Sequence, residues 1–317
     1  MLFAAETTVV EFPRLGWGPW KLNRFVVEDL FGRFSIAWYG LIICCAMIGA
    51  CLIIMKNATK REGFKSESFT DYYLASIPLS IVGARLMYVL TSLDKYRSFW
   101  DVFKIWEGGL AVYGGVILGF SAIALVARIK KENFFQVMDA IVPGLILAQC
   151  IGRWGNFVNG EAHGYETGLP WGMVVNGEGP FHPTFLYESL LTLTGFLLME
   201  FVLYRRKKFH GELLCFYFVW YGVGRACIEG LRTDSLYFGP LRASQVIGIV
   251  SAAGGLVLAF FLWRSARNAP KTGSQEEPEK TDDNPEGSEE PQDETPDGSA
   301  KKDPAENPAA EPEKGGK

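Results

Sequence analysis

Residues 134–164 read FFQVMDAIVPGLILAQCIGRWGNFVNGEAHG, an apolar run that ends abruptly in a polar block. The apolar part, Phe134–Ile151, is long enough to cross the hydrocarbon core of a bilayer as a helix. The polar part, Gly152–Gly164, places Arg153, two asparagines and Glu161 at the membrane boundary. Charged groups are costly near hydrocarbon and tend to mark substrate or ion pathways. This stretch therefore predicts a membrane-spanning fold and a functional site at its edge.

Six further apolar runs predict an all-α, polytopic membrane protein with seven transmembrane helices. The seven spans are Ile36–Met55, Tyr72–Leu93, Gly108–Ala127, Phe134–Ile151, Thr184–Tyr204, Leu213–Gly230 and Ser244–Trp263. Lys and Arg cluster after the first, third, fifth and seventh spans, and such clusters are typical of cytoplasmic loops. The pattern predicts a cytoplasmic C-terminus, an N-terminus outside, and an extracytoplasmic position for the 152–164 block.

The last fifty or so residues have a different composition. Residues 268–317 contain 15 Asp and Glu, 6 Lys and Arg, and no aromatic, Val, Ile, Leu or Met residue, as is typical of a disordered tail. Their net charge is −9 and that of the whole chain is −4, so residues 1–267 carry +5. We therefore expect an extracytoplasmic N-terminal arm at 1–34, a seven-helix transmembrane domain at 35–267 and a disordered acidic cytoplasmic tail at 268–317.

Several classes of site lack their usual sequence evidence. The six cysteines all fall within predicted spans and form no CxxC pair, which favours packing residues over a disulfide framework. The chain contains no GxxxxGK[ST], GxSxG or HExxH motif. The three histidines have no partners at metal-ligand spacing. We expect neither a metal site nor a cofactor.

The polar block after the fourth span has two interpretations. Arg153 can bind an anionic group while Asn156, Asn159 and Glu161 orient it, or Arg153 can snorkel to water from an ordinary interfacial loop. Four polar side chains fall within nine residues and alternate with glycines. This density favours a shaped pocket.

The sixth span carries a second cluster of polar residues. Tyr221, Arg225 and Glu229 follow at successive i, i+4 positions and so share one helix face. Arg225 lies twelve residues from the start of the span, about 18 Å at the helical rise, and therefore past the membrane centre. The alternative is an internal ion pair of Arg225 with Glu229 that makes the helix tolerable in lipid. Arg232 adds a positive charge near the outer end.

Two tyrosines also admit two interpretations. Tyr113 lies in the third span within WEGGLAVYGGVILG, whose glycines favour close helix packing. Tyr39 lies near the start of the first span within AWYGL. Each side chain is either an aromatic residue of the membrane interface or a hydroxyl that reaches into a pocket.

Five sequence blocks together resemble the prolipoprotein diacylglyceryl transferases of bacteria. The blocks are AWYGL, WEGGLAVYGG, GRWGNFVNGEAHG, HPTFLYE at 182–188 and YGVGRACIEGLRTDS at 221–235. They occur in the order and seven-span layout of that family and cover roughly residues 20–265. Five ordered blocks make a strong signal where any one alone is moderate.

The resemblance implies transfer of the diacylglyceryl group from phosphatidylglycerol to the lipobox cysteine thiol of a preprolipoprotein. A thioether forms and glycerol phosphate is released, which is the first step of bacterial lipoprotein maturation. The expected partners are phosphatidylglycerol, preprolipoprotein signal peptides and the lipid bilayer, with no nucleic acid. The expected location is the bacterial cytoplasmic (inner) membrane, with the active site facing the extracytoplasmic side.

The same resemblance implies roles for individual residues. Arg153 and Arg225 are expected to stabilise the phosphate as the carbon–oxygen bond breaks, and Glu161 or Tyr113 is expected to take the thiol proton. The residues expected to bind phosphatidylglycerol are Arg153, Asn156, Asn159, Gly164, Tyr39, Glu229 and Arg232. A better-known branch of the family has a histidine at the position of Tyr113, so an obligatory histidine base is in doubt.

Two other functions fit parts of the pattern. A transporter or channel for an anionic solute also places arginines and amides in a helical bundle. Internal symmetry favours that function, but the polar blocks at 150–164 and 221–235 do not resemble one another. A structural scaffold gains nothing from arginines inside the membrane.

Overall fold

The chain is mostly helical, as its apolar runs predict. The computed structural model describes residues 7–30, 34–93, 96, 98–105, 108–233 and 237–268, within one compact unit that ends at Ala269. Its helices are α1 (Trp38–Lys60), α2 (Ser66–Thr91), α3 (Val112–Lys130), α4 (Phe134–Asn159), α5 (Thr184–Leu197), α6 (Tyr204–Arg206), α7 (Glu212–Glu229) and α8 (Ala243–Asn268), with the 3-10 turns η1 (Pro13–Leu15) and η3 (Phe99–Phe103) and the π-helix η5 (Leu198–Leu203). The predicted acidic tail lies outside the described residues, apart from Asn268.

The described helices include six that are long and apolar enough to cross a membrane. They are α1, α2, α3, α4, the continuous stretch Thr184–Arg206 and α8. The predicted sixth span corresponds to α7, whose 18 residues include Glu212, Arg225 and Glu229. Because α7 is only 18 residues long, any stretch of it that could span a membrane includes all three charges, whereas each of the six spans contains an 18-residue stretch with at most two. The helices are those of a multi-pass membrane protein.

The prediction of an all-α fold is wrong at one end of the bundle, where the described residues form short antiparallel sheets. The strands are β1 (Thr7–Phe12), β2 (Trp17–Asn23), β3 (Phe25–Leu30), β4 (Phe34–Ala37), β5 (Met173–Val175), β6 (Glu178–Phe181), β7 (Tyr237–Phe238) and β8 (Leu241–Arg242). The largest sheet has the order β2-β1-β5-β6, so the N-terminal arm is joined to the segment after α4. Val10 and Phe12 are two residues apart and so lie on the same face of β1. Both are buried in a cluster with Phe185 of α5.

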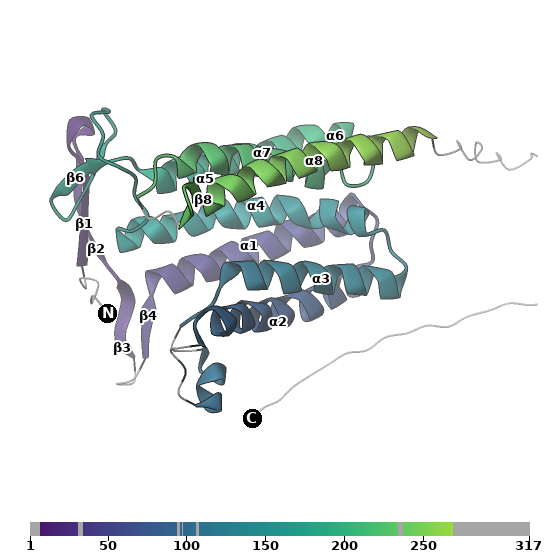
Figure 1. Ribbon diagram of the computed structural model, residues 1–317, viewed down its shortest axis with the longest axis horizontal. Coiled ribbons are helices and arrows are strands. Elements are labelled where there is room, and N and C mark those ends of the chain that lie inside the picture. The colour runs from purple at the N-terminus through teal and green to yellow at the C-terminus, as the bar shows by residue number, and fades with distance from the viewer. Residues whose placement is uncertain are drawn as a thin grey trace, which may run out of the picture. The chain divides into compact units, whose positions relative to one another are not determined.

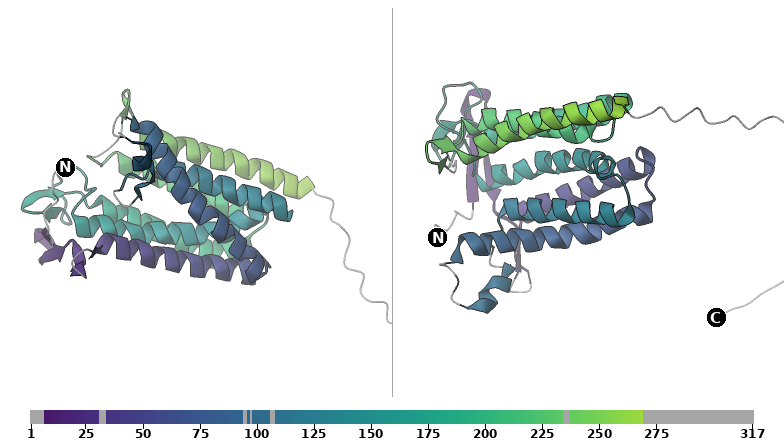
Figure 2. Two further views of the ribbon diagram at one scale, coloured as in Figure 1. Left: turned by 90° about the horizontal axis from the view of Figure 1, so that it is seen from below. Right: turned by 45° about the vertical axis from the view of Figure 1, so that its right-hand side comes forward.

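Helix α4 lies at the centre of the bundle. It packs against α1 on one side and against α5 and α7 on the other, an arrangement visible in Figures 1 and 2. The carboxylate of Asp139 in α4 is completely buried and accepts hydrogen bonds from the backbone N–H groups of Gly211, Leu213 and Leu214. Because these are the unsatisfied donors at the start of α7, Asp139 fixes that helix end to α4.

Close packing explains the glycines of α3. A Cβ atom at Gly114 would lie 2.1 Å from the backbone oxygen of Gly83 in α2, and one at Gly119 would lie 2.3 Å from the Ser80 hydroxyl. The two helices therefore approach closely, as predicted. Gly108 and Gly109 differ, because they precede α3 and have positive φ angles of 86° and 79°, where glycine is favoured.

Glu200 is a buried carboxylate in η5. It lies near the end of the bundle opposite the sheets. It is 1% exposed and forms ion pairs with Lys56 Nζ at 2.7 Å and Arg61 Nη2 at 2.8 Å. Asn57 donates a further hydrogen bond of 3.2 Å to it. These contacts tie α1 to η5 through a buried ion-pair cluster.

Candidate active site

Arg153 lies in the last two turns of α4 and points toward the interior of the bundle. The helix continues to Asn159 and stops because Gly160 adopts the left-handed conformation, with φ of 63°. The Arg153 side chain is 24% exposed and forms an ion pair with Glu188 of α5. A snorkelling arginine reaches water instead, so the geometry supports the pocket interpretation.

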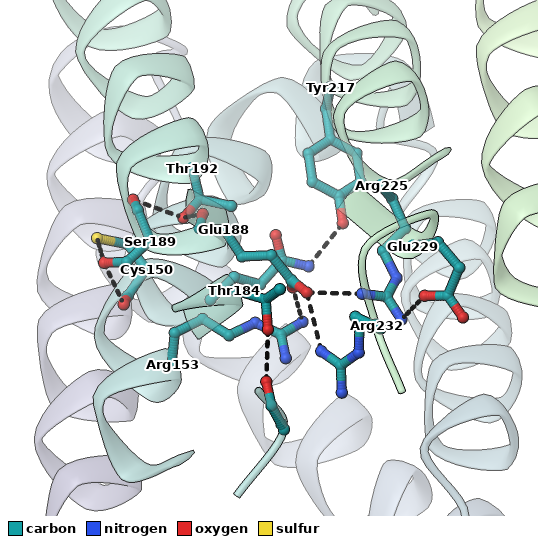
Figure 3. Close-up of polar contacts among 12 residues, drawn as sticks. Cys150, Arg153, Thr184, Glu188, Ser189, Thr192, Tyr217, Arg225, Glu229 and Arg232 are labelled. Atoms are coloured by element: carbon teal, nitrogen blue, oxygen red, sulfur yellow. Dashed lines mark hydrogen bonds and ion pairs between the residues drawn. The ribbon is translucent and has the colours of Figure 1, made fainter. Parts of the chain in front are cut away.

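Glu188 joins three arginines from three separate segments (Figure 3). Its Oε1 atom lies 2.6 Å from Arg225 Nη1 and 3.0 Å from Arg232 Nη1, and its Oε2 atom is paired with Arg153. The carboxylate is 2% exposed. One buried acceptor thus brings together the ends of α4 and α7 and the turn that follows α7.

Glu229 holds the other side of the Arg225 guanidinium. Its Oε2 atom lies 2.5 Å from Arg225 Nη2, and its side chain is 1% exposed. Arg242 of β8 donates hydrogen bonds to the Glu229 carbonyl and, at 3.2 Å, to the Tyr165 hydroxyl. Arg225 is therefore held between two carboxylates, and its pair with Glu229 is one part of a larger cluster.

The cluster keeps an excess of positive charge. Three guanidiniums face the two carboxylates of Glu188 and Glu229, which leaves a net charge of +1 among these side chains. Removing such groups from water is costly, and a buried ion cluster seldom stabilises a fold more than apolar residues would. Preorganised guanidiniums suit an anion such as phosphate, which they can bind through two parallel hydrogen bonds.

The predicted amides and Glu161 come together in a neighbouring group. Glu161 Oε1 accepts hydrogen bonds from Asn156 Nδ2 at 3.3 Å and from Asn159 Nδ2 at 3.2 Å. Glu161 is exposed, and both asparagines are half-buried. Asn156 follows Arg153 by one helical turn, so this group lies next to the arginine cluster.

The two predicted tyrosines have different surroundings. Tyr39 packs on Gly155 of α4, where a Cβ atom would lie 2.6 Å from Tyr39 Cδ2. Gly155 therefore makes room for this ring beside the polar block. Tyr113 is the second residue of α3 and is 47% exposed. Within the described residues, its hydroxyl forms no hydrogen bond.

Gly164 is surrounded by protein backbone. Its N–H donates to the His182 carbonyl at 2.9 Å, and the next N–H, of Tyr165, donates to the Leu231 carbonyl at 2.9 Å. A Cβ atom at Gly164 would lie 2.5 Å from the Leu231 oxygen and 2.7 Å from His182 Cβ. The absence of a side chain thus lets three segments meet next to Arg232.

We expect Gly164→Ala to destabilise the protein. The added methyl group must displace the Leu231 backbone, and such overpacking costs about 1–3 kcal/mol. Thermal unfolding in detergent measures the effect. Gly168→Ala is the matched control, because a Cβ atom at Gly168 meets nothing within 4 Å. Equal stability of the two variants would contradict the packing role of Gly164.

Sequence reasoning missed Glu188, the residue that organises the cluster. It lies within HPTFLYE, which the resemblance includes, but no role was predicted for it. A usable signal was present, because a carboxylate inside an apolar span needs a partner. Its partners Arg225 and Arg232 lie 37 and 44 residues away.

In the part of the chain that the structure describes, no three His, Cys, Asp or Glu side chains are placed to hold a metal ion.

Comparisons with known proteins agree with the five sequence blocks. A family model described as prolipoprotein diacylglyceryl transferase matches residues 26–261. A phosphatidylglycerol–prolipoprotein diacylglyceryl transferase of Clostridioides difficile is 42% identical over 245 residues, which are 77% of this chain and 97% of that protein. Proteins of the same name from Thermotoga maritima and Listeria monocytogenes are 41% and 40% identical, covering 78% and 81% of this chain and 86% and 95% of their own lengths.

Proposed function

Because the chain belongs to the prolipoprotein diacylglyceryl transferase family, we propose that it transfers the diacylglyceryl group of phosphatidylglycerol to the lipobox cysteine of a preprolipoprotein. It is therefore a transferase. The cysteine sulfur forms a bond to the glyceryl carbon while the bond from that carbon to the phosphate oxygen breaks. The electrons of the broken bond leave with glycerol phosphate, and the thiol proton passes to a base.

The convergence of three arginines on Glu188 carries this proposal. Negative charge grows on the phosphate as the carbon–oxygen bond breaks. Preorganised donors that face this charge are usually the largest single contribution to catalysis. We assign Arg153 and Arg225 to the phosphate, with Arg232 as a further binding residue.

In this proposal Glu188 and Glu229 position the arginine side chains and do not contact the substrate. Without substrate, Glu188 supplies the acceptor that keeps three like charges close together. The net charge of +1 that remains matches the single negative charge of a phosphodiester. Glu229 orients the Arg225 fork through its 2.5 Å contact.

The exposed group at the end of α4 is suited to the glycerol and thiol side of the reaction. Asn156 and Asn159 can position the glycerol head group, and Glu161, which both amides hold in place, is a candidate base. Little base strength is required, because a cysteine thiol is already a few per cent thiolate at neutral pH. Tyr39 lies beside this group and is assigned to substrate binding.

We expect Tyr113→Phe to retain near-normal turnover if Glu161 is the base. The phenol oxygen forms no hydrogen bond within the described residues and is half exposed, so its removal leaves the arginine cluster intact. The transfer rate is measured at saturating phosphatidylglycerol. A loss of about 100-fold or more, the size of a general-base contribution, would instead indicate that Tyr113 relays the thiol proton. The pH dependence of the transfer rate would then test that role.

The location and topology of the site are also part of the proposal. We infer that α7 also crosses the membrane as the sixth of seven spans, that the N-terminus lies outside and the tail inside, and that the site faces the extracytoplasmic side of the bacterial inner membrane. The basic clusters between spans support this orientation. The strands β1 to β6 then lie on the outer side of the 35–267 catalytic domain, and the acidic residues that follow α8, which lie outside the described residues, are on the cytoplasmic side.

The test uses purified protein in detergent with phosphatidylglycerol and a lipobox peptide. We expect the peptide to gain the mass of one diacylglyceryl group on its cysteine, with release of glycerol phosphate. Well-folded protein that yields no adduct would contradict the proposal. Uptake of an anionic solute into proteoliposomes, without any adduct, would favour the transporter alternative.

A further inference from the structure

A polar pair joins α4 to α7 deeper in the bundle than the arginines. Gln149 Nε2 donates a hydrogen bond of 2.9 Å to the Tyr217 hydroxyl. Gln149 precedes Arg153 by four residues and so lies on the same face of α4. Tyr217 precedes Arg225 by eight residues, about two turns nearer the start of α7. Figure 3 shows the Tyr217 hydroxyl directed toward the cluster around Glu188 and Arg225.

One end of the Gln149 amide has no partner among the described residues. Its Oε1 atom is buried without a hydrogen bond, although the residue as a whole is only half-buried. A buried polar atom left unsatisfied costs free energy. A purely structural role, in which the Gln149–Tyr217 hydrogen bond only links α4 to α7, would explain this contact. It would not explain why the other end of the amide has no partner among the described residues.

The free end can act as a donor. A half-turn of the amide exchanges its oxygen and nitrogen, and the Tyr217 hydroxyl can then donate to Oε1 as readily as it now accepts from Nε2. That exchange leaves the –NH2 group of Gln149 available to a ligand. Tyr217 itself stays in place, because its ring stacks on Tyr221 with centroids 5.5 Å apart and is 9% exposed.

We propose that Gln149 and Tyr217 form a binding site for an ester carbonyl of the donor's diacylglyceryl group. This inference rests on the proposed transfer reaction. Along α4, Gln149 lies about 6 Å deeper than Arg153 at the helical rise. In a glycerophospholipid the ester groups follow the phosphate on the acyl-chain side, so a phosphate at the arginines places them at this depth. An ester carbonyl accepts hydrogen bonds and carries no charge. It is therefore a suitable acceptor for the neutral –NH2 group of Gln149.

The Gln149–Tyr217 pair would fix how deeply the lipid lies in the site. The arginines hold the phosphate, and the Gln149 amide holds the ester on the other side of the glyceryl carbon that reacts. Two points of attachment fix the carbon between them, and such positioning contributes to rate by keeping the reacting atoms in line. The site also distinguishes ester-linked lipids from ether-linked lipids, since an ether has no carbonyl oxygen.

The test compares ester-linked phosphatidylglycerol with its dialkyl ether analogue as donors. Both lipids have the same phosphate, head group and reacting carbon. We expect the wild-type protein to prefer the ester by roughly three- to tenfold in kcat/KM, the size of one hydrogen bond. Tyr217→Phe and Gln149→Leu are each expected to reduce this preference to about onefold. Tyr73→Phe, which removes a hydroxyl bonded to the Cys51 carbonyl in the α1–α2 pair, should leave the preference intact.

The ratio of two donors in one sample cancels any loss of folded protein, so a less stable variant still gives a result. Displacement of a fluorescent phosphatidylglycerol by the two lipids gives a second ratio that requires no turnover. Equal use of both donors by the wild type would overturn the inference, as would an ester preference that survives in both variants. Absence of transfer from either lipid by folded protein would contradict the proposed function instead.

Discussion

Arg225→Ala is expected to lower the rate of diacylglyceryl transfer by about 100- to 1,000-fold, the usual effect of removing one preorganised donor to a developing charge. Arg225 stands between Glu188 and Glu229, so its guanidinium has little freedom before substrate arrives. It therefore needs no reorganisation as the phosphate gains charge. The loss should fall on kcat at saturating phosphatidylglycerol, because the contact strengthens in the transition state. Arg153→Ala is expected to behave in the same way.

Arg61→Ala provides the matched control for this measurement. The Arg61 side chain is 25% exposed and also pairs with a buried glutamate, in this case Glu200. It lies at the other end of the bundle, so its loss should lower stability without changing turnover per folded molecule. Arg225→Lys separates charge from geometry, because lysine keeps the charge but lacks the planar fork that binds phosphate bidentately. An Arg225→Ala enzyme within about tenfold of wild type would remove Arg225 from the catalytic group.

Glu188→Gln is expected to lower both stability and turnover. Three guanidiniums then lose their shared charged acceptor and repel one another at close range. Breaking a buried ion pair by removing one partner costs about 3–5 kcal/mol. A neutral amide holds the arginines less firmly, so the phosphate must order them as it binds. We expect a higher KM for phosphatidylglycerol together with a lower kcat.

Glu200→Gln separates the two effects of that substitution. Glu200 is as buried as Glu188 and also pairs with more than one cation, so a similar loss of stability is expected. Thermal unfolding compares the two variants, and transfer per folded molecule is measured alongside. If both variants lose stability equally and both retain wild-type turnover, Glu188 is a structural residue only.

Six of the seven predicted spans are helices long and apolar enough to cross a membrane, and they were predictable because length and composition decide whether a helix can do so. The sheet that joins the N-terminal arm to the segment after α4 was not predictable, because β1 is a short segment whose partner β5 lies far along the chain. Val10 pairs with Val175, and nothing in the six residues of β1 specifies that neighbour. The π-helix at Leu198–Leu203 was equally hidden, since its apolar pattern continues that of α5.

The candidate site was predicted in its local parts. Asn156, Asn159 and Glu161 lie within six consecutive residues, and they meet in the structure. The Arg225 and Glu229 pair follows from helical spacing alone. The junction at Glu188 required three separate segments to converge, and the spacing of residues within one helix carries no such information.

The capping of α7 by Asp139 has a consequence for the precision of the site. Asp139 also contacts Lys207 Nζ at 2.9 Å, and that ammonium group lies 2.5 Å from Glu62. Arg225 stands about 18 Å along α7 from this cap, on a helix that also packs against α4, α5 and α8. A displacement of 1 Å at a reacting group can cost about 100-fold in rate, and over this distance it corresponds to a tilt of only about three degrees. The position of Arg225 therefore depends on a buried carboxylate at the opposite end of α7 as well as on the packing of that helix against its neighbours.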